Sequence, residues 1–275
     1  MEKMYYGVVA LLDILGARGI WHRYEINEII NSWKDIQKYL KTEIEMKKKS
    51  EYINRPKFNP ELHTFSDTVI LISKTEKYDP DEIMRVSSTV GSTFAHAIEK
   101  GILFRGAISI GKFYSHQNMI IGPAIDDAAE WYNITDWAGI HLTPSTTYAL
   151  EGYLMNDYDI KLWLCPYDIP IKKKDGSKYA IKGWAVNWPS LYDAESHMYV
   201  TDIVKTLDYD ASKPELFLQY FKRKFSMNSI SEKDVSKYQN TLKFIEYAIK
   251  YYYKIINGKS DKNNNLELKN NSNKN

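Results

Sequence analysis

Apolar residues form an unbroken run near the start of the chain and then change to a helical spacing. The run Tyr5-Tyr6-Gly7-Val8-Val9-Ala10-Leu11-Leu12 ends at Asp13, and a continuous apolar stretch of this length predicts a buried strand over residues 5–13. The residues that follow at steps of three and four predict one buried face of a long helix: Ile26, Ile29, Ile30, Trp33, Ile36, Leu40 and Ile44. Lys47-Lys48-Lys49 near its end suits the negative end of the helix dipole.

A second helix has a clear start signal. The two prolines in residues 54–60 predict a loop, and residues 61–73 predict either a strand pair or one long strand that carries Asp67. Asp79 is then a predicted N-cap, with Pro80 at the first helical position and Glu82 three residues after the cap. The inner stripe of this helix is Ile83, Val86, Val90, Phe94 and Ala97, and Gly101 predicts its end.

The rest of the chain continues to alternate between strand and helix patterns. The further predicted elements are a strand over 102–113, a strand at Ile120-Ile121, a helix over 126–132, a strand over 140–143, a helix opened by Pro144, a hairpin over 161–188 and a final amphipathic helix from Val235 to Ile256. Alternation of this kind predicts an α/β or α+β fold, in which helices cover a sheet. The sequence shows no internal repeat.

Composition narrows the class of protein. The chain has 275 residues, 44% of them hydrophobic, and a formal net charge of +2, which is too small a basic excess to predict nucleic-acid binding. A single cysteine, Cys165, excludes an internal disulfide and disfavours a cysteine zinc site. The absence of a long apolar segment and of a signal-peptide pattern predicts a soluble cytoplasmic protein without membrane contact. Residues 258–275, rich in Asn and Lys, predict a disordered tail.

Two aspartates at the ends of apolar strands carry the chemical signal. Asp13 closes the first strand, and Asp67 precedes Thr68-Val69-Ile70-Leu71-Ile72. A carboxylate in such a stretch is costly unless it is paired or bound to a cation, so two of them side by side predict a divalent-metal site. The glycine turn after Asp13 offers backbone N–H groups to phosphate, which points to chemistry on a nucleoside triphosphate. Alternatively, Asp13 caps the following turn, and Asp67 is an ordinary hairpin-turn residue.

Five segments in order resemble class III nucleotide cyclases: "LLDILGARG", "HTFSDTVILIS", "LFRGAISIGKFY", "IIGPAIDDAAEWYN" and "GIHLTPSTTYAL". The resemblance covers roughly residues 5–150, and the FSD, RGAISIG and GPAI segments are most similar to the Pycsar pyrimidine cyclases of bacterial antiphage defence. It implies a ferredoxin-like catalytic domain over residues 1–190, a helical extension over 191–257 and the tail at 258–275.

The resemblance also implies roles for individual residues. Asp13, Asp67 and the backbone carbonyl of Ile14 would hold two Mg²⁺ or Mn²⁺ ions, which activate the ribose 3′-hydroxyl to attack the α-phosphorus. The turn that cradles the phosphates would consist of Gly16, Ala17 and Arg18, although an ordinary strand-to-helix turn explains Gly16 equally well. Arg105 would reach phosphate, or a carboxylate across a dimer; the alternative for Arg105 is a structural ion pair.

Base recognition departs from the purine-cyclase pattern. His63 falls where purine cyclases carry a base-reading Lys or Glu, and Met119 falls where they carry its partner, often an Asp. Neither side chain reproduces the pair that reads adenine, so the resemblance implies a different base. The alternative for His63 is a strand histidine with a local hydrogen bond. Phe65, in the same hairpin, joins these two among the implied nucleotide-binding residues.

The residues at the helix start near Gly122 also differ from the purine-cyclase pattern. Asp126 takes the place of the ribose-orienting Asn, and Glu130 that of the transition-state Arg, yet a carboxylate cannot stabilise charge on a transferring phosphoryl group. Both acids also suit the first turns of a helix through its dipole. Three residues are candidates for the missing cation: Arg18, Arg105 and Lys172.

These implications lead to one expectation with several rivals. The resemblance implies a homodimer with shared sites that converts UTP to 3′,5′-cyclic UMP, or CTP to cyclic CMP, and a product that activates a separate antiviral effector. One rival is a degenerate homologue that only binds nucleotide. The other is an unrelated α/β interaction protein whose acids are structural.

Overall fold

The computed structural model describes residues 4–15, 25–49, 58–76, 78–117, 119–156, 158–172, 175–190, 218–219, 221–223 and 232–272. The strand β1 (Tyr5–Ile14) lies in the interior of the sheet and is buried from Gly7 to Asp13. On one side β1 pairs antiparallel with β3 (Thr68–Thr75), and on the other with β4 (Phe104–His116). The apolar run at the start of the sequence is therefore an interior strand with a partner on each side.

The strand order defines the architecture. The sheet runs β2-β3-β1-β4-β6-β8-β7, where β2 is Glu61–Phe65, β6 is Ile140–Leu142, β7 is Leu164–Lys172 and β8 is Lys178–Val186; β5 (Met119–Ile121) pairs only with β4. The first four strands, with α2 (Ile26–Lys49) before β2 and α3 (Pro80–Glu99) before β4, form a ferredoxin-like βαββαβ unit. This confirms the predicted ferredoxin-like α+β fold, and it settles residues 61–73 as a strand pair.

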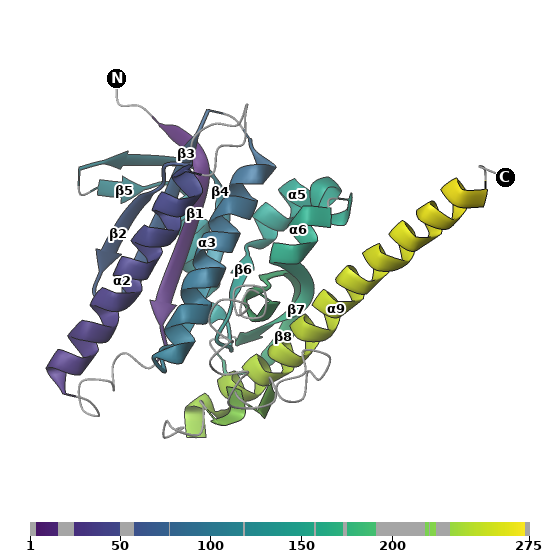
Figure 1. Ribbon diagram of the computed structural model, residues 1–275. Coiled ribbons are helices and arrows are strands. Elements are labelled where there is room, and N and C mark those ends of the chain that lie inside the picture. The colour runs from purple at the N-terminus through teal and green to yellow at the C-terminus, as the bar shows by residue number, and fades with distance from the viewer. Residues whose placement is uncertain are drawn as a thin grey trace.

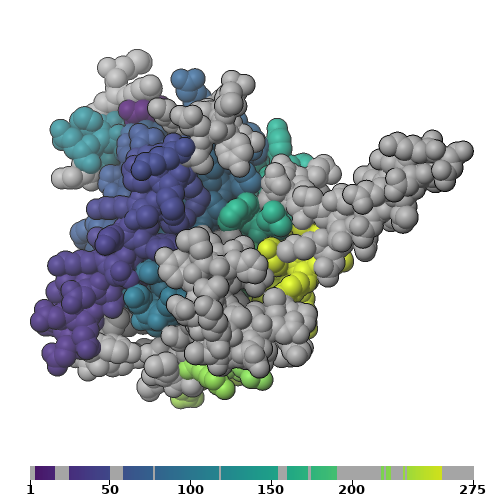
Figure 2. Space-filling model, viewed as in Figure 1, coloured from purple at the N-terminus to yellow at the C-terminus, as the bar shows by residue number. Residues whose placement is uncertain are grey.

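Helices cover the two faces of the sheet unequally. Both α2 and α3 lie on one face (Figure 1) and pack with it into the main core. The helix α4 (Pro123–Ile134) packs on β4 and β1, where Ala124 and Ala128 join a smaller apolar cluster with Val9, Leu11 and Phe113. Figure 2 shows that α2 lies at the molecular surface, on the face of the sheet that α2 and α3 cover. The second face is the one on which the candidate site lies.

The helix α3 follows its sequence signals closely. The side chain of Asp79 accepts a hydrogen bond from the backbone N–H of Asp81, Pro80 opens the helix, and the predicted inner stripe is buried. Glu82 behaves differently from a capping-box residue, because its buried carboxylate binds the hydroxyl of Ser73 and the guanidinium of Arg85.

The second half of the chain extends the sheet and adds a long helix. After β6 come α5 (Pro144–Asn156) and α6 (Tyr158–Trp163), and β7 and β8 form the predicted hairpin. A short 3₁₀ turn (Glu232–Asp234) leads into α9 (Val235–Ser272), which packs on β7 and α6 through Phe244, Ile245 and Ala248. Among the described helices, none has an 18-residue stretch apolar enough to cross a membrane.

The last helix is longer than the apolar pattern predicts. Its apolar stripe ends near Ile256, whereas α9 continues to Ser272, through most of the segment predicted as a disordered tail. A helix that is already anchored adds one backbone hydrogen bond per further residue, so no new nucleus is needed to continue it.

Candidate active site

One row of paired residues crosses four strands at the end of β1. Thr68 of β3 lies opposite both Phe65 of β2 and Asp13 of β1, and Asp13 lies opposite Arg105 of β4. Directly paired residues of antiparallel strands project their side chains from the same face of the sheet. Phe65, Thr68, Asp13 and Arg105 therefore share the face on which α4 packs.

Asp67 lies beside the same strand end. It occupies the tight turn between β2 and β3, where Ser66 adopts a left-handed conformation with φ of 55°. The backbone N–H of Ile14 donates to the backbone carbonyl of Asp67 at 3.2 Å, so this turn is fixed against the last residue of β1. The two aspartates are thus neighbours although they are 54 positions apart in the sequence.

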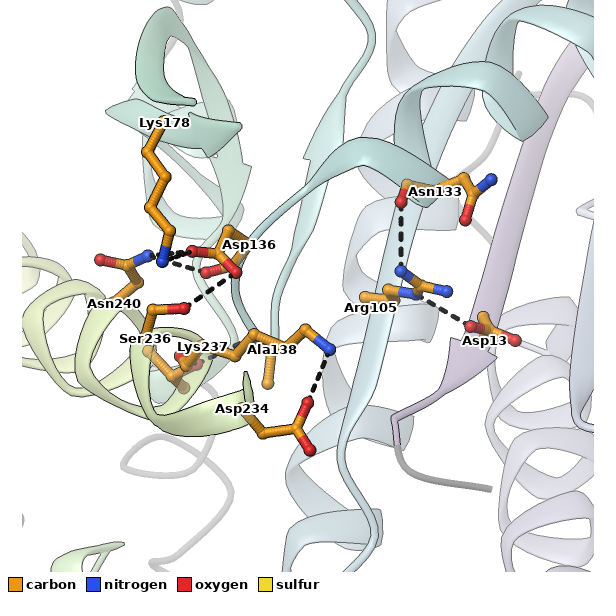
Figure 3. Close-up of polar contacts among 11 residues, drawn as sticks. Asp13, Arg105, Asn133, Asp136, Ala138, Lys178, Asp234, Ser236, Lys237 and Asn240 are labelled. Atoms are coloured by element: carbon orange, nitrogen blue, oxygen red, sulfur yellow. Dashed lines mark hydrogen bonds and ion pairs between the residues drawn. The ribbon is translucent and has the colours of Figure 1, made fainter. Parts of the chain in front are cut away.

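Three groups contact Arg105, and Figure 3 shows two of them, Asp13 and Asn133. Its Nε donates to Oδ2 of Asp13 at 2.9 Å, and its Nη1 donates to the backbone carbonyl of Asn133 at 3.2 Å. Its guanidinium carbon also lies 5.5 Å from the ring centre of Tyr132, in a cation–π arrangement. Arg105 therefore pairs with a carboxylate of its own chain, and the last turn of α4 orients it.

The pKa of the Tyr132 phenol reflects its burial and the nearby charges of Asp13, Arg105 and Asp67. Burial raises the pKa of its phenol, and the negative charge of Asp13 raises it further, while Arg105 opposes this and Asp67 adds a smaller upward effect. The phenol consequently stays protonated and can donate a hydrogen bond beside the two carboxylates.

Asp13 and Asp67 suit a metal ion whose remaining ligands come from the substrate and from water. Within the described ranges, no three His, Cys, Asp or Glu side chains form a group able to hold a metal ion. Mg²⁺ is commonly held by one or two carboxylates together with substrate phosphates and water, so a third protein acid is unnecessary. Asp13 is 9% exposed, and Asp67 is partly exposed at the mouth of the turn. This pair of hard oxygen donors suits Mg²⁺ or Mn²⁺.

Of the two predicted base-reading residues, His63 lies on the same face of the sheet as Asp13, whereas Met119 pairs with His116, which alternates to the opposite face of β4 from Arg105. His63 pairs with Ile70 of β3, one row further along the sheet than Phe65. Its Nε2 lies 3.5 Å from Oε2 of Glu61, whose carboxylate also binds Lys74 and, at 2.7 Å, the hydroxyl of Ser115. Met119 is exposed at the start of β5.

Asp126 and Glu130 point away from the sheet. Ala124 and Ala128 of α4 are buried, whereas Asp126 and Glu130 are exposed. Two residues correspond to about 200° of rotation around an α-helix, so these acids occupy the side of α4 opposite the buried alanines. Within one chain, the structure does not bring them to Asp13.

The predicted phosphate-binding residues and cations differ in whether the structure places them near Asp13. Gly16, Ala17 and Arg18 lie outside the described residues. Lys172 ends β7, at the far edge of the sheet, and β4, β6 and β8 separate that strand from β1. Among the described candidate cations, Arg105 is the one placed at Asp13.

Sequence reasoning missed Tyr132 and Asn133. Their contributions are a ring face and a backbone carbonyl, which no residue pattern signals. The signal that was present is indirect: both lie in the last turn of the helix that begins at Gly122.

Comparisons with known proteins were made by sequence and by fold. No family model matches the chain, and no curated protein matches it. Among solved structures, the adenylyl cyclase CyaB from P. aeruginosa is similar with 11% identity and a TM-score of 0.48, over 67% of this chain and 94% of that one. The guanylyl cyclase Cya2 gives 11% and 0.48, over 68% and 93%. The guanylate cyclase domain of RhGC from Catenaria anguillulae, in complex with GTP, gives 15% and 0.45, over 67% and 98%.

All three of these structures are adenylyl or guanylyl cyclases.

Proposed function

We propose that this protein is a metal-dependent pyrimidine nucleotide cyclase that converts UTP to 3′,5′-cyclic UMP and pyrophosphate. The observation that carries the proposal is the meeting of three residues at one strand end: Asp13 and Arg105 pair on one face of the sheet, and the turn that contains Asp67 is bonded to the end of the same strand. Two acids and a guanidinium, brought together from three separate segments, suit a ligand that carries both phosphates and a divalent cation.

Each residue has a definite task in this scheme. Asp13 and Asp67 would hold Mg²⁺ or Mn²⁺, and such ions supply a lower pKa for the ribose 3′-hydroxyl and offset charge on the departing pyrophosphate. Arg105 contributes a permanent positive charge with several N–H donors that suit phosphate oxygens. The 3′-hydroxyl loses its proton to solvent water, its oxygen forms a bond to the α-phosphorus, the bond from that phosphorus to the bridging oxygen breaks, and pyrophosphate leaves.

The choice of a pyrimidine rests on the residues near the base-reading positions. His63 and Met119 stand where purine cyclases carry a charged pair, and Met119 brings no charge and only a weak acceptor. His63 shares its face with Phe65, a ring on which a base can stack. With its Nε2 beside the carboxylate of Glu61, a neutral imidazole directs its one N–H there and presents Nδ1 as an acceptor for an N–H of a pyrimidine base.

A homodimer completes the scheme. Asp126 and Glu130 face outward from α4 and away from the Asp13 of their own chain, so they act at a nucleotide only if it is bound by a second copy. Phe65 is 81% exposed in the row that contains Asp13, and a ring this exposed beside a site is typical of an interface residue. In this scheme the product is a diffusible second messenger for a separate effector protein.

The test is to incubate the purified protein with ATP, GTP, CTP and UTP in turn, with Mn²⁺ or Mg²⁺, and to identify the products by mass. We expect cyclic UMP, and none from Asp67→Asn. The matched control is Asp168→Asn, an exposed aspartate of β7, which should retain wild-type turnover.

Other outcomes are equally informative. Cyclic CMP would move the base assignment to cytidine, and cyclic AMP or cyclic GMP would refute the pyrimidine assignment. No product from any of the four nucleotides would refute the cyclase proposal. Equal turnover by Asp67→Asn and wild type would refute the metal role of Asp67.

A further inference from the structure

The first turns of α9 form hydrogen bonds with a short segment in the middle of the chain, residues 136–138. The side chain of Asn240 donates to the backbone carbonyl of Asp136 at 2.8 Å, and the backbone N–H of Ala138 donates to the hydroxyl of Thr241 at 2.8 Å. The hydroxyl of Ser236 donates to Oδ1 of Asp136 at 3.1 Å (Figure 3). Three consecutive residues, 136–138, are thus fixed by one helix.

Neighbouring strands fix the same segment from the other side. The carboxylate of Asp136 is only 1% exposed and accepts from Nζ of Lys178 on β8 at 3.1 Å. Its backbone N–H donates to the carbonyl of Pro170 on β7 at 2.9 Å. A buried carboxylate with this many partners is a strong positional restraint, because the loss of any partner leaves charge or a polar atom unsatisfied in the interior.

Trp137 adds an apolar anchor at the same place. Its ring is completely buried, stacks on Tyr167 at 5.5 Å and meets Phe244 of α9 edge-on at 4.7 Å. Polar and apolar contacts therefore both tie residues 136–138 to α9.

Residues 136–138 closely follow the last turn of α4, which contacts Arg105. Asn133, whose carbonyl accepts from Arg105, precedes Asp136 by three residues. Between them, the hydroxyl of Thr135 donates to the carbonyl of Tyr132 at 3.0 Å, and Thr135 also forms a β-bridge with Ile171. Hydrogen bonds and strand contacts therefore restrain the backbone from Tyr132 to Ala138.

We propose that α9 positions Arg105 through residues 132–138, so that the C-terminal helix takes part in building the site at Asp13. This inference rests on the proposed function, and it makes Ser236, Asn240 and Asp136 positioning residues. They touch neither the acids nor Arg105. They hold the carbonyl of Asn133 and the ring of Tyr132 where these two groups orient the guanidinium against Asp13.

The experiment compares two changes in the same turns of α9. Ser236→Ala/Asn240→Ala removes the side-chain hydrogen bonds to Asp136. Lys237→Ala is the matched control, because its ammonium pairs with Asp234 at 2.9 Å and lies apart from Asp136 (Figure 3). We expect the double variant to lower kcat about tenfold or more, since small misplacements at a site are costly, and Lys237→Ala to stay within about twofold of wild type.

A double-mutant cycle separates positioning from a general loss of stability. Both changes are repeated in an Arg105→Lys background, which keeps the charge and loses the planar guanidinium. If α9 acts through Arg105, the double variant causes little further loss there. Losses that multiply equally in both backgrounds would overturn the proposal. So would an equal loss of kcat in Ile245→Val, a buried substitution in α9, at a matched fall in melting temperature.

Amide hydrogen exchange provides a readout that needs no turnover. Exchange over residues 132–138 should accelerate in Ser236→Ala/Asn240→Ala and remain unchanged in Lys237→Ala. Unchanged exchange in the double variant would overturn the proposal even if kcat fell. A wild-type protein without any cyclase product would instead overturn the proposed function, and the exchange result would still report whether α9 holds this segment.

Discussion

His141 gives the stability of this protein a defined dependence on pH. Its imidazole is completely buried on β6 between β4 and β8, and burial lowers its pKa from 6.5 to about 4. Its Nδ1 lies 3.0 Å from the backbone carbonyl of Gly106, which can only accept, so Nδ1 carries the proton. Nε2 is buried and has no hydrogen-bond partner within the described residues, and protonation there would place an uncompensated charge in the core.

The sign and size of the effect follow from linkage. Above pH 6.5 the histidine is neutral in both folded and unfolded chains. As the pH falls from 6.5 to 4, the unfolded chain binds the proton first, so the free energy of unfolding decreases. The shift corresponds to about 3 kcal/mol by pH 4, since each unit of pKa is worth about 1.36 kcal/mol. The charge of Asp127 opposes the shift, although burial outweighs it.

The measurement is urea unfolding followed by far-UV circular dichroism at several pH values between 7 and 4. His141→Asn retains a donor for the carbonyl of Gly106 and does not titrate, so it serves as the reference. We expect the wild type to lose about 3 kcal/mol more than the variant over this range. Parallel pH dependence of the two proteins would refute the reasoning, whatever the offset between them.

Three further predictions concern the site and the sheet. Asp13→Asn should lower the free energy of unfolding by about 1.5–3 kcal/mol, because Arg105 loses a charged hydrogen-bond partner; an unchanged urea midpoint would contradict this pairing. Phe65→Glu should shift the proposed homodimer to monomer in sedimentation velocity, because this ring is 81% exposed beside the site; a persistent dimer would exclude this face as the interface. Gly7→Ala should lower the free energy of unfolding by about 1–3 kcal/mol, because a Cβ there would lie 2.0 Å from the backbone oxygen of Ser73. Gly152→Ala, where a Cβ meets nothing within 4 Å, is the control for urea unfolding and should not be destabilising.

Predictions that depend on local pattern are confirmed. The apolar run before Asp13 is a buried interior strand, and the helix that opens at Asp79-Pro80 has its cap and its inner stripe as predicted. Local patterns succeed because a strand or a helix face requires a fixed spacing along the chain, whatever it later packs against.

Predictions at element ends are less accurate. The helix at Gly122 begins at Pro123, three residues before its predicted start, and α9 continues past its apolar stripe to Ser272. Side-chain pattern carries little information where backbone hydrogen bonding alone decides whether a helix continues.

The sequence by itself determined the alternation of strands and helices and singled out Asp13 and Asp67 as carboxylates at strand ends, and its resemblance to a family implied the ferredoxin-like arrangement. Only the tertiary structure decided that Arg105 lies opposite Asp13, that Asp126 and Glu130 face outward, and that α9 holds the segment after Asn133. Strand register and helix rotation depend on contacts between residues far apart in sequence. A shift of one position in a strand would turn Arg105 to the opposite face of the sheet.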